Sequence, residues 1–201
     1  AAVQHALAAH PDHSVALVWF DAHADLNTPE SSPSGAFTGM VVRALLGEAP
    51  DGLAATGATR LDPGRIVLAG TRELDDGEAA FIEASGIRVV GVAELDDPQR
   101  VVEAVAATGA TAVYVHIDLD VLDPSAIDGV GSPVPFGVLP ERLTDAIRAL
   151  RARFAFAGAG VTEFAPESPD AAGRDLAVIL RVLGALTGPV PGAPATSSGG
   201  Q

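Results

Sequence analysis

Short apolar runs alternate with amphipathic stretches along almost the whole chain. The apolar runs are bounded by turn-forming residues, which is typical of buried strands. The stretches between them carry apolar residues at helical spacing, and several begin with acidic residues, as helices prefer. The predicted strands are 14–20, 65–70, 87–92, 112–120 and 154–164, and the predicted helices are 1–9, 38–49, 75–85, 96–108, 139–150 and 170–186. This alternation favours an α/β fold with a mostly parallel sheet.

Two long loops interrupt the pattern, at residues 21–37 and 49–63. The first is polar and rich in Pro, Ser and Gly, and loops of that length without structure of their own are usually functional or disordered. We predict one domain over residues 1–188. The remainder, 189–201, has the Pro, Gly and Ser content of a disordered tail.

Composition narrows the class of protein. The chain has 201 residues, a net charge of -14 and no cysteine, so disulfides and thiolate metal sites are excluded. The negative charge argues against nucleic acid and against anionic membrane surfaces as partners. No apolar run approaches the roughly 20 residues of a membrane span, and no signal peptide is visible, so we expect a cytoplasmic protein.

Acidic residues follow three of the predicted strands directly. Asp21, His23 and Asp25 follow the first, Asp118 and Asp120 end the fourth, and Glu163 ends the fifth. Because ligands of open α/β sheets bind outside the carboxyl ends of the strands, we expect these side chains to converge. Converging carboxylates repel one another unless a cation lies between them. Carboxylates with a little imidazole suit Mn²⁺ better than a soft metal, so the pattern predicts a metal site holding one ion or a pair.

Three segments together resemble one known family. The sequences "DAHADLNTP" (21–29), "HIDLDVLDP" (116–124) and "GVTEFAP" (160–166) are similar to those of the arginase/agmatinase/formiminoglutamase (ureohydrolase) family, over about residues 10–187. The resemblance implies a three-layer αβα sandwich with a mostly parallel sheet that lacks its N-terminal part. It also implies two Mn²⁺ ions per site, hydrolysis of a guanidino group, and a homo-oligomer, either a trimer or a hexamer.

The resemblance assigns metal ligands. It implies that Asp21 and Asp118 bridge both metal ions. Asp25 then completes the ligands of one ion, and His23 and Asp120 complete those of the other. Asp120 is also the residue that carries a proton to the leaving amine.

The resemblance also assigns substrate contacts. Glu163 pairs with the guanidinium, since the fork geometry of a carboxylate suits it. The "LNTP" sequence is arginase-like rather than agmatinase-like. The remaining contacts that the resemblance implies are Asn27 and Ser34 for an amino acid's carboxylate, Asp75 with Glu78 nearby for its α-amino group, and Ser132 beside the site.

Some positions depart from the family's pattern. The family has an earlier "GGDHS" motif whose histidine binds one metal, and "PDHS" (11–14) lies too close to the next motif to match it. We therefore expect His13 to be a surface turn residue and the true motif to lie in an absent N-terminal part. Thr38 stands where arginases usually carry a proton-shuttling histidine, and Ala36 stands where an amide commonly contacts the substrate. We expect Trp19 and His116 to be core residues, with an orienting role next to a metal ligand as the alternative for His116.

The resemblance therefore implies a binuclear manganese hydrolase of a guanidino group, and we expect its reaction to be the conversion of L-arginine into urea and ornithine. One alternative keeps the enzyme class and changes the substrate to agmatine, guanidinobutyrate or formiminoglutamate. Another is a metal-binding relative or fragment with impaired catalysis, which the residues at positions 36 and 38 motivate. A phosphate-ester hydrolase is disfavoured, since no Gly-rich phosphate loop is present.

Overall fold

The computed structural model describes residues 1–11, 14–50 and 52–189. Its centre is a parallel sheet of five strands in the order β3-β2-β1-β4-β5. The strands are β1 (Val15–Phe20), β2 (Ile66–Ala69), β3 (Arg88–Val90), β4 (Ala112–Asp118) and β5 (Ala155–Thr162). The helices are α1 (Ala2–Ala9), α2 (Val41–Leu45), α3 (Asp76–Ser85), α4 (Gln99–Ala106), α5 (Pro140–Arg153) and α6 (Pro169–Thr187).

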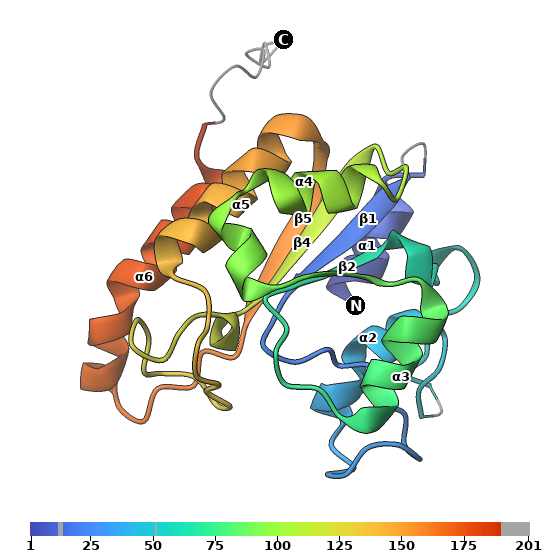
Figure 1. Ribbon diagram of the computed structural model, residues 1–201, viewed down its shortest axis with the longest axis horizontal. Coiled ribbons are helices and arrows are strands. Elements are labelled where there is room, and N and C mark those ends of the chain that lie inside the picture. Colours follow the sequence, from blue (N-terminus) through green and yellow to red (C-terminus); the bar gives the residue numbers. More distant parts are fainter. Residues whose placement is uncertain (12–13, 51, 190–201) are drawn as a thin grey trace, which may run out of the picture.

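Side chains of β1 alternate between two apolar clusters, because successive strand residues point to opposite faces. Ala16, Val18 and Phe20 belong to the cluster that also holds the buried residues of α4, α5 and α6. Leu17 and Trp19 belong to the cluster that packs against α1, α2 and α3. Figure 1 shows these two groups of helices on opposite sides of the sheet. The predicted three-layer αβα sandwich is confirmed.

The predicted elements occur in the predicted order, although the bounds of several differ, among them the strand predicted over 154–164, which ends at Thr162 just before Glu163. The helix expected over 38–49 begins as a 3₁₀ turn, Phe37–Met40, and its α-helical part ends at Leu45. Gly47 lies just beyond with a φ of 89°, a backbone conformation that ends helices. The strand expected over 112–120 ends at Asp118, and a 3₁₀ turn, Leu119–Val121, follows it. Asp120 therefore lies on a turn rather than on the strand.

Two predictions concern parts of the chain that the structure does not describe. His13, expected on a surface turn, lies outside the described residues, as do residues 190–201 of the predicted tail. Among the helices of the described ranges, none has both the length and the apolar content needed to cross a membrane.

Strand order decides where a site can form. The chain passes from β1 outward to β2 and β3, and then returns to the other side of β1 with β4. Such a reversal leaves a crevice at the carboxyl ends of the two strands where it occurs, because the connections leave in opposite directions. Phe20 of β1 pairs with Ile117 of β4, so Asp21 and Asp118 follow these neighbouring positions.

Candidate metal centre and its cavity

A cavity of about 280 Å³ opens at this crevice. Its wall contains every residue that the sequence analysis proposed for the site: Asp21, His23, Asp25, Asn27, Ser34, Asp75, Glu78, Asp118, Asp120, Ser132 and Glu163. Thr38 lines the same cavity, as do Ser32 and Gly39, which the sequence analysis did not propose. The cavity therefore brings together residues from the segments that follow β1, β2, β4 and β5.

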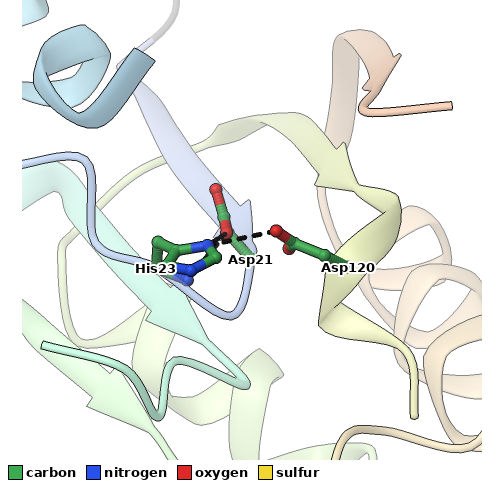
Figure 2. Close-up of side chains that lie close together, drawn as sticks. All are labelled: Asp21, His23 and Asp120. Atoms are coloured by element: carbon green, nitrogen blue, oxygen red, sulfur yellow. Dashed lines mark hydrogen bonds and ion pairs between the residues drawn. The ribbon is translucent and has the colours of Figure 1, made fainter. Parts of the chain in front are cut away.

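Asp21, His23 and Asp120 form one side of the centre, as Figure 2 shows. The Nδ1 atom of His23 lies 3.1 Å from Asp120 Oδ2 and 3.4 Å from Asp21 Oδ1. The backbone N–H of Ala22 donates to Asp120 Oδ1 at 3.2 Å, although 98 positions separate the two residues. The loop after β1 and the turn after β4 are thus bonded to each other directly at the ligand side chains.

Two groups of three side chains meet the geometric requirement for a metal ion. One group is Asp21, His23 and Asp120, and the other is Asp21, Asp25 and Asp118. In each group the potential ligand atoms lie within 4.8 Å of one another, and Asp21 belongs to both. A shared carboxylate between two ligand sets is the arrangement that a pair of cations requires.

Burial and charge make this cluster unfavourable without a cation. Burial, together with the negative charges of Asp120 and Asp118, raises the pKa of Asp21 to about 8, although the hydrogen bond from His23 lowers it. Burial also raises the pKa of Asp25 well above its ordinary value, and the charge of Asp21 adds to the shift. A carboxylate protonated near neutral pH at the centre of an acidic cluster marks a position where positive charge is missing.

The imidazole of His23 supplies part of that charge. Hydrogen bonds to Asp120 and Asp21 raise the pKa of His23 to about 10. Burial alone would raise the pKa of Asp120, but the hydrogen bond and the charge of His23 lower it. A neutral imidazole, and not an imidazolium, is the form that binds a metal, so a bound ion would replace the proton on His23.

One polar atom gives a direct test of fit to a cation. Asp118 Oδ1 is buried and has no hydrogen-bond partner within the described part of the chain. Buried carboxylate oxygens are ordinarily paired, because an unpaired one costs free energy. This oxygen belongs to the second ligand group, so the residues present fit a hard cation with oxygen ligands.

Trp19 and His116, on the neighbouring strands β1 and β4, contact two of the metal-ligand candidates. The indole N–H of Trp19 donates to Asp21 Oδ2 at 2.9 Å, and its ring stacks on that of His116 at 3.5 Å. His116 Nε2 lies 3.1 Å from Thr162 Oγ1 and 3.9 Å from Asp118 Oδ2. Both residues are buried or half-buried, as expected of core residues, but they also contact the carboxylates. Sequence reasoning missed the role of Trp19, and its position two residues before Asp21 was the available signal.

Backbone conformation is unusual at two of the predicted site residues. Asp25 has a φ of 54° and Glu163 has a φ of 61°, in the left-handed region that few residues other than glycine adopt. The carbonyl of Asp25 accepts the backbone N–H groups of Val42 and Arg43, at the start of α2. Strained backbone is concentrated at functional sites, so both positions support the location of the site.

Glu163 lies against the loop that carries Ser132. A Cβ at Gly131 would lie 2.9 Å from Glu163 Oε2, so a larger residue there would displace this carboxylate from its present position. Ala165 N–H donates to Gly129 O at 2.9 Å and holds the two segments together. Burial raises the pKa of Glu163, and the nearby charges of Asp118 and Asp120 raise it further. A cationic ligand beside it would favour its charged form.

Asn27, Asp75 and Glu78 form a polar wall of the same cavity. Asn27 Nδ2 donates to Asp75 Oδ2 at 2.8 Å, and Ser31 Oγ donates to Asn27 Oδ1 at 2.8 Å. Glu78 accepts the N–H of Leu26 at 2.9 Å and the N–H of Asp75 at 3.0 Å. Both carboxylate oxygens of Glu78 therefore accept backbone hydrogen bonds and hold the first loop against the start of α3.

Comparison with known proteins adds an independent finding. The model of the Arginase family matches residues 1–186. An arginase from Bacillus caldovelox is 40% identical over 129 residues, which cover 61% of this chain and 43% of that protein. An N(omega)-hydroxy-L-arginine amidinohydrolase from Streptomyces lavendulae is 35% identical over 175 residues, which cover 87% of this chain and 60% of that protein.

Solved structures agree with the sequence comparisons. The crystal structure of an arginase from Bacillus subtilis superposes with a TM-score of 0.80 at 29% identity, and covers 94% of this chain and 68% of that one. The chain spans less than half the length of the curated arginases it matches, 44% for one from Staphylococcus aureus.

Proposed function

This chain belongs to the arginase family, whose members are metal-dependent ureohydrolases, and on that premise we propose that it hydrolyses the guanidino group of L-arginine with two Mn²⁺ ions. The observation that carries the proposal is the cavity at the carboxyl ends of β1 and β4, where two carboxylate-rich ligand groups share Asp21. The net charge of -14 and the acidic wall of the cavity suit a cationic substrate.

The first ligand group would hold one ion and the second group the other, with the shared Asp21 between them. When bound, the ions would lower the pKa of a water molecule and stabilise its oxygen as a hydroxide that can attack the guanidinium carbon. Asp118 Oδ1, which has no hydrogen-bond partner among the described residues, would be one of the oxygens that hold an ion.

The chain's own residues would then bind and orient the substrate. Glu163 would accept two hydrogen bonds from the guanidinium, because a carboxylate and a guanidinium match as a fork. The wall formed by Asn27 and Asp75 would bind the α-amino and α-carboxylate groups, with Ser34 at its exposed edge. Partners for both charged groups favour an α-amino acid over agmatine, which has no carboxylate.

Asp120 would transfer the proton that the leaving amine requires. Its Oδ2 atom faces His23 Nδ1 at 3.1 Å, and the residue lines the cavity beside both ligand groups. The carboxylate would receive the proton from the attacking water and deliver it to the amine as the C–N bond breaks.

One specific observation favours a second substrate. The similarity to the Streptomyces lavendulae protein, named for N(omega)-hydroxy-L-arginine, extends over more of this chain than the similarity to the arginases. Hydrolysis of that substrate would release hydroxyurea and ornithine, and hydrolysis of L-arginine releases urea and ornithine. The amino-acid end is identical in both, so the same polar wall would bind it.

The test is product analysis of the Mn²⁺-loaded chain with five substrates. L-Arginine, N(omega)-hydroxy-L-arginine, agmatine, guanidinobutyrate and formiminoglutamate are supplied separately, and urea, hydroxyurea and formamide are measured. We expect urea from L-arginine, and formamide alone would contradict the guanidino proposal. Glu163→Gln should lower kcat/KM by about ten-fold or more, since it removes a charged hydrogen-bond partner. Glu83→Gln, an exposed carboxylate on α3, is the matched control.

A further inference from the structure

Arg72 follows β2 and extends its guanidinium into a cluster of backbone carbonyls. All of its donor nitrogens are used, and within the described residues each acceptor is a backbone carbonyl rather than a carboxylate. The acceptors are the carbonyl oxygens of Gly70, Asp120, Val121, Leu122, Val134 and Pro135, at 2.7–3.5 Å. Only arginine presents five N–H donors in a rigid planar fork, so this set of contacts requires its geometry as well as its charge.

The acceptors belong to two segments that carry candidate site residues. The bond to Asp120 O, at 2.9 Å, and the bond to Val121 O, at 3.2 Å, hold the 3₁₀ turn after β4. The bond to Val134 O, at 2.7 Å, holds the loop that follows Ser132. The side chain of Arg72 therefore connects the end of β2 to both segments on the far side of the crevice.

The backbone around Arg72 connects the same strand end to the loop after β1. The N–H groups of Arg72 and Glu73 both donate to Ala22 O, at 2.9 and 3.0 Å. The hydroxyl of Thr71 donates to Asp21 O at 3.1 Å. Residues 71–73 thus contact the backbone of Asp21 and Ala22 on one side and that of Asp120 on the other.

Close packing leaves little freedom in this arrangement. A Cβ at Gly70 would lie 2.6 Å from Val121 Cγ2, so glycine is needed for the 3₁₀ turn to approach the end of β2. Gly70 also has a φ of 84°, a conformation that glycine adopts without strain. The turn that carries Asp120 is therefore seated on residues 70–72.

We propose that Arg72, assisted by Thr71, is a positioning residue that sets the separation between the Asp21–His23 loop and Asp120. The proposal rests on the proposed function, since its purpose is to preorganise the first ligand group for a cation. The direct contacts between the loops, Ala22 N–H to Asp120 Oδ1 and His23 Nδ1 to Asp120 Oδ2, depend on that separation. Arg72 is not among the residues that line the cavity, so it would act through the ligand side chains.

Three substitutions separate the fork, the charge and the hydroxyl. Arg72→Gln removes the charge and most donors. Arg72→Lys keeps the charge but offers a point cation in place of the fork. Thr71→Val keeps the shape and removes the hydrogen bond to Asp21 O. Arg100→Gln is the matched control, because Arg100 is an exposed arginine on α4 that pairs with Glu103.

The first readout is the affinity for Mn²⁺ alone, by calorimetry on the full chain. Arg72→Gln should weaken it by about 10- to 100-fold, Arg72→Lys by nearly as much, and Thr71→Val by less. Arg100→Gln should leave it unchanged. An Arg72→Lys variant with the affinity of the unaltered chain would show that charge suffices and would overturn the positioning role.

The second readout needs no metal. Hydrogen exchange of the Ala22 amide reports its bond to Asp120, and amides of β1 such as that of Val18 report the stability of the whole fold. In the metal-free Arg72→Gln chain, exchange at Ala22 should accelerate at least about ten-fold relative to β1. Equal acceleration at both places, or none at Ala22, would overturn the proposal. If the unaltered chain binds no Mn²⁺, the proposed function fails, whereas the exchange comparison still decides the role of Arg72.

Discussion

The indole of Trp19 donates a hydrogen bond to Asp21, the carboxylate that both candidate ligand groups share. The bond is 2.9 Å long and both residues are almost fully buried. Asp21 Oδ1 accepts a hydrogen bond from the backbone N–H of His23 at 2.7 Å, so each oxygen of this carboxylate has a donor before any ion binds. The orientation of the central ligand is therefore set by neighbours on its own strand and loop.

Trp19→Phe should weaken Mn²⁺ binding by about 10- to 100-fold. Phenylalanine keeps an aromatic ring at this position but lacks the N–H that donates to Asp21 Oδ2. Calorimetric titration measures the change. Leu17→Ile, a buried apolar substitution on the same face of β1, controls for repacking. Equal losses of affinity in the two variants would show that packing, and not the hydrogen bond, is responsible.

Asp118→Asn should abolish stoichiometric Mn²⁺ binding and turnover, because a neutral amide cannot replace the charged carboxylate of the second ligand group. The metal-free chain should not lose thermal stability, since the charge of Asp118 opposes ionisation of both Asp21 and Asp25. Metal analysis and thermal denaturation measure both effects. Asp145→Asn, at an exposed carboxylate on α5, is the control. Full metal content in Asp118→Asn would contradict its assignment as a ligand.

Binding of Mn²⁺ at pH 7 should release at least about two protons per chain, since metal ligands must be deprotonated. The pKa of Asp21, about 8, and that of His23, about 10, both lie above pH 7 in the metal-free chain. Calorimetry in buffers of different ionisation enthalpy counts the protons. Release near zero would mean that these two groups do not bind the ion.

The stability of the metal-free chain should fall as pH rises from about 6 to 10. The folded pKa values of Asp21 and His23 are raised above their ordinary values of 3.8 and 6.5, so the folded chain binds more protons than the unfolded chain in this window. Asp120, whose pKa is lowered, is ionised in both states there and contributes no slope. Urea denaturation at several pH values measures the trend, and saturating Mn²⁺ should remove or reverse it. A metal-free stability that rises over this window would contradict the raised pKa values.

Thr38→His should increase turnover of L-arginine, by up to about 100-fold, because a histidine titrates near neutral pH and a threonine does not. Thr38 lines the cavity, so the new side chain would face the substrate. Steady-state kinetics at several pH values measure the change. Thr56→His, at an exposed position away from the cavity, should have no effect. An unchanged or lower rate in Thr38→His would show that the cavity does not use a proton shuttle at this position.

Local patterns in the sequence determined the order and type of the elements. Runs such as residues 15–20 bury both faces of a strand, and the acidic residues that follow them have no place inside such a core. Parallel strands bring their carboxyl ends to one edge, so the convergence of Asp21, Asp118 and Glu163 followed from strand periodicity and the acidic ends. The family's motifs supplied most of the remaining residues of the cavity wall, but not Ser32 or Gly39.

Only the tertiary structure decided which groups contact which. Arg72 lies 48 positions from Asp120 in sequence, and Ala22 lies 98 positions from it, so no local pattern encodes their hydrogen bonds. The same holds for the stacking of Trp19 on His116, which depends on the register of β1 against β4. Hydrophobic periodicity specifies the face on which a side chain lies, whereas hydrogen bonds and pKa shifts depend on distances of a few ångströms across separate loops, and these are set by how the layers pack.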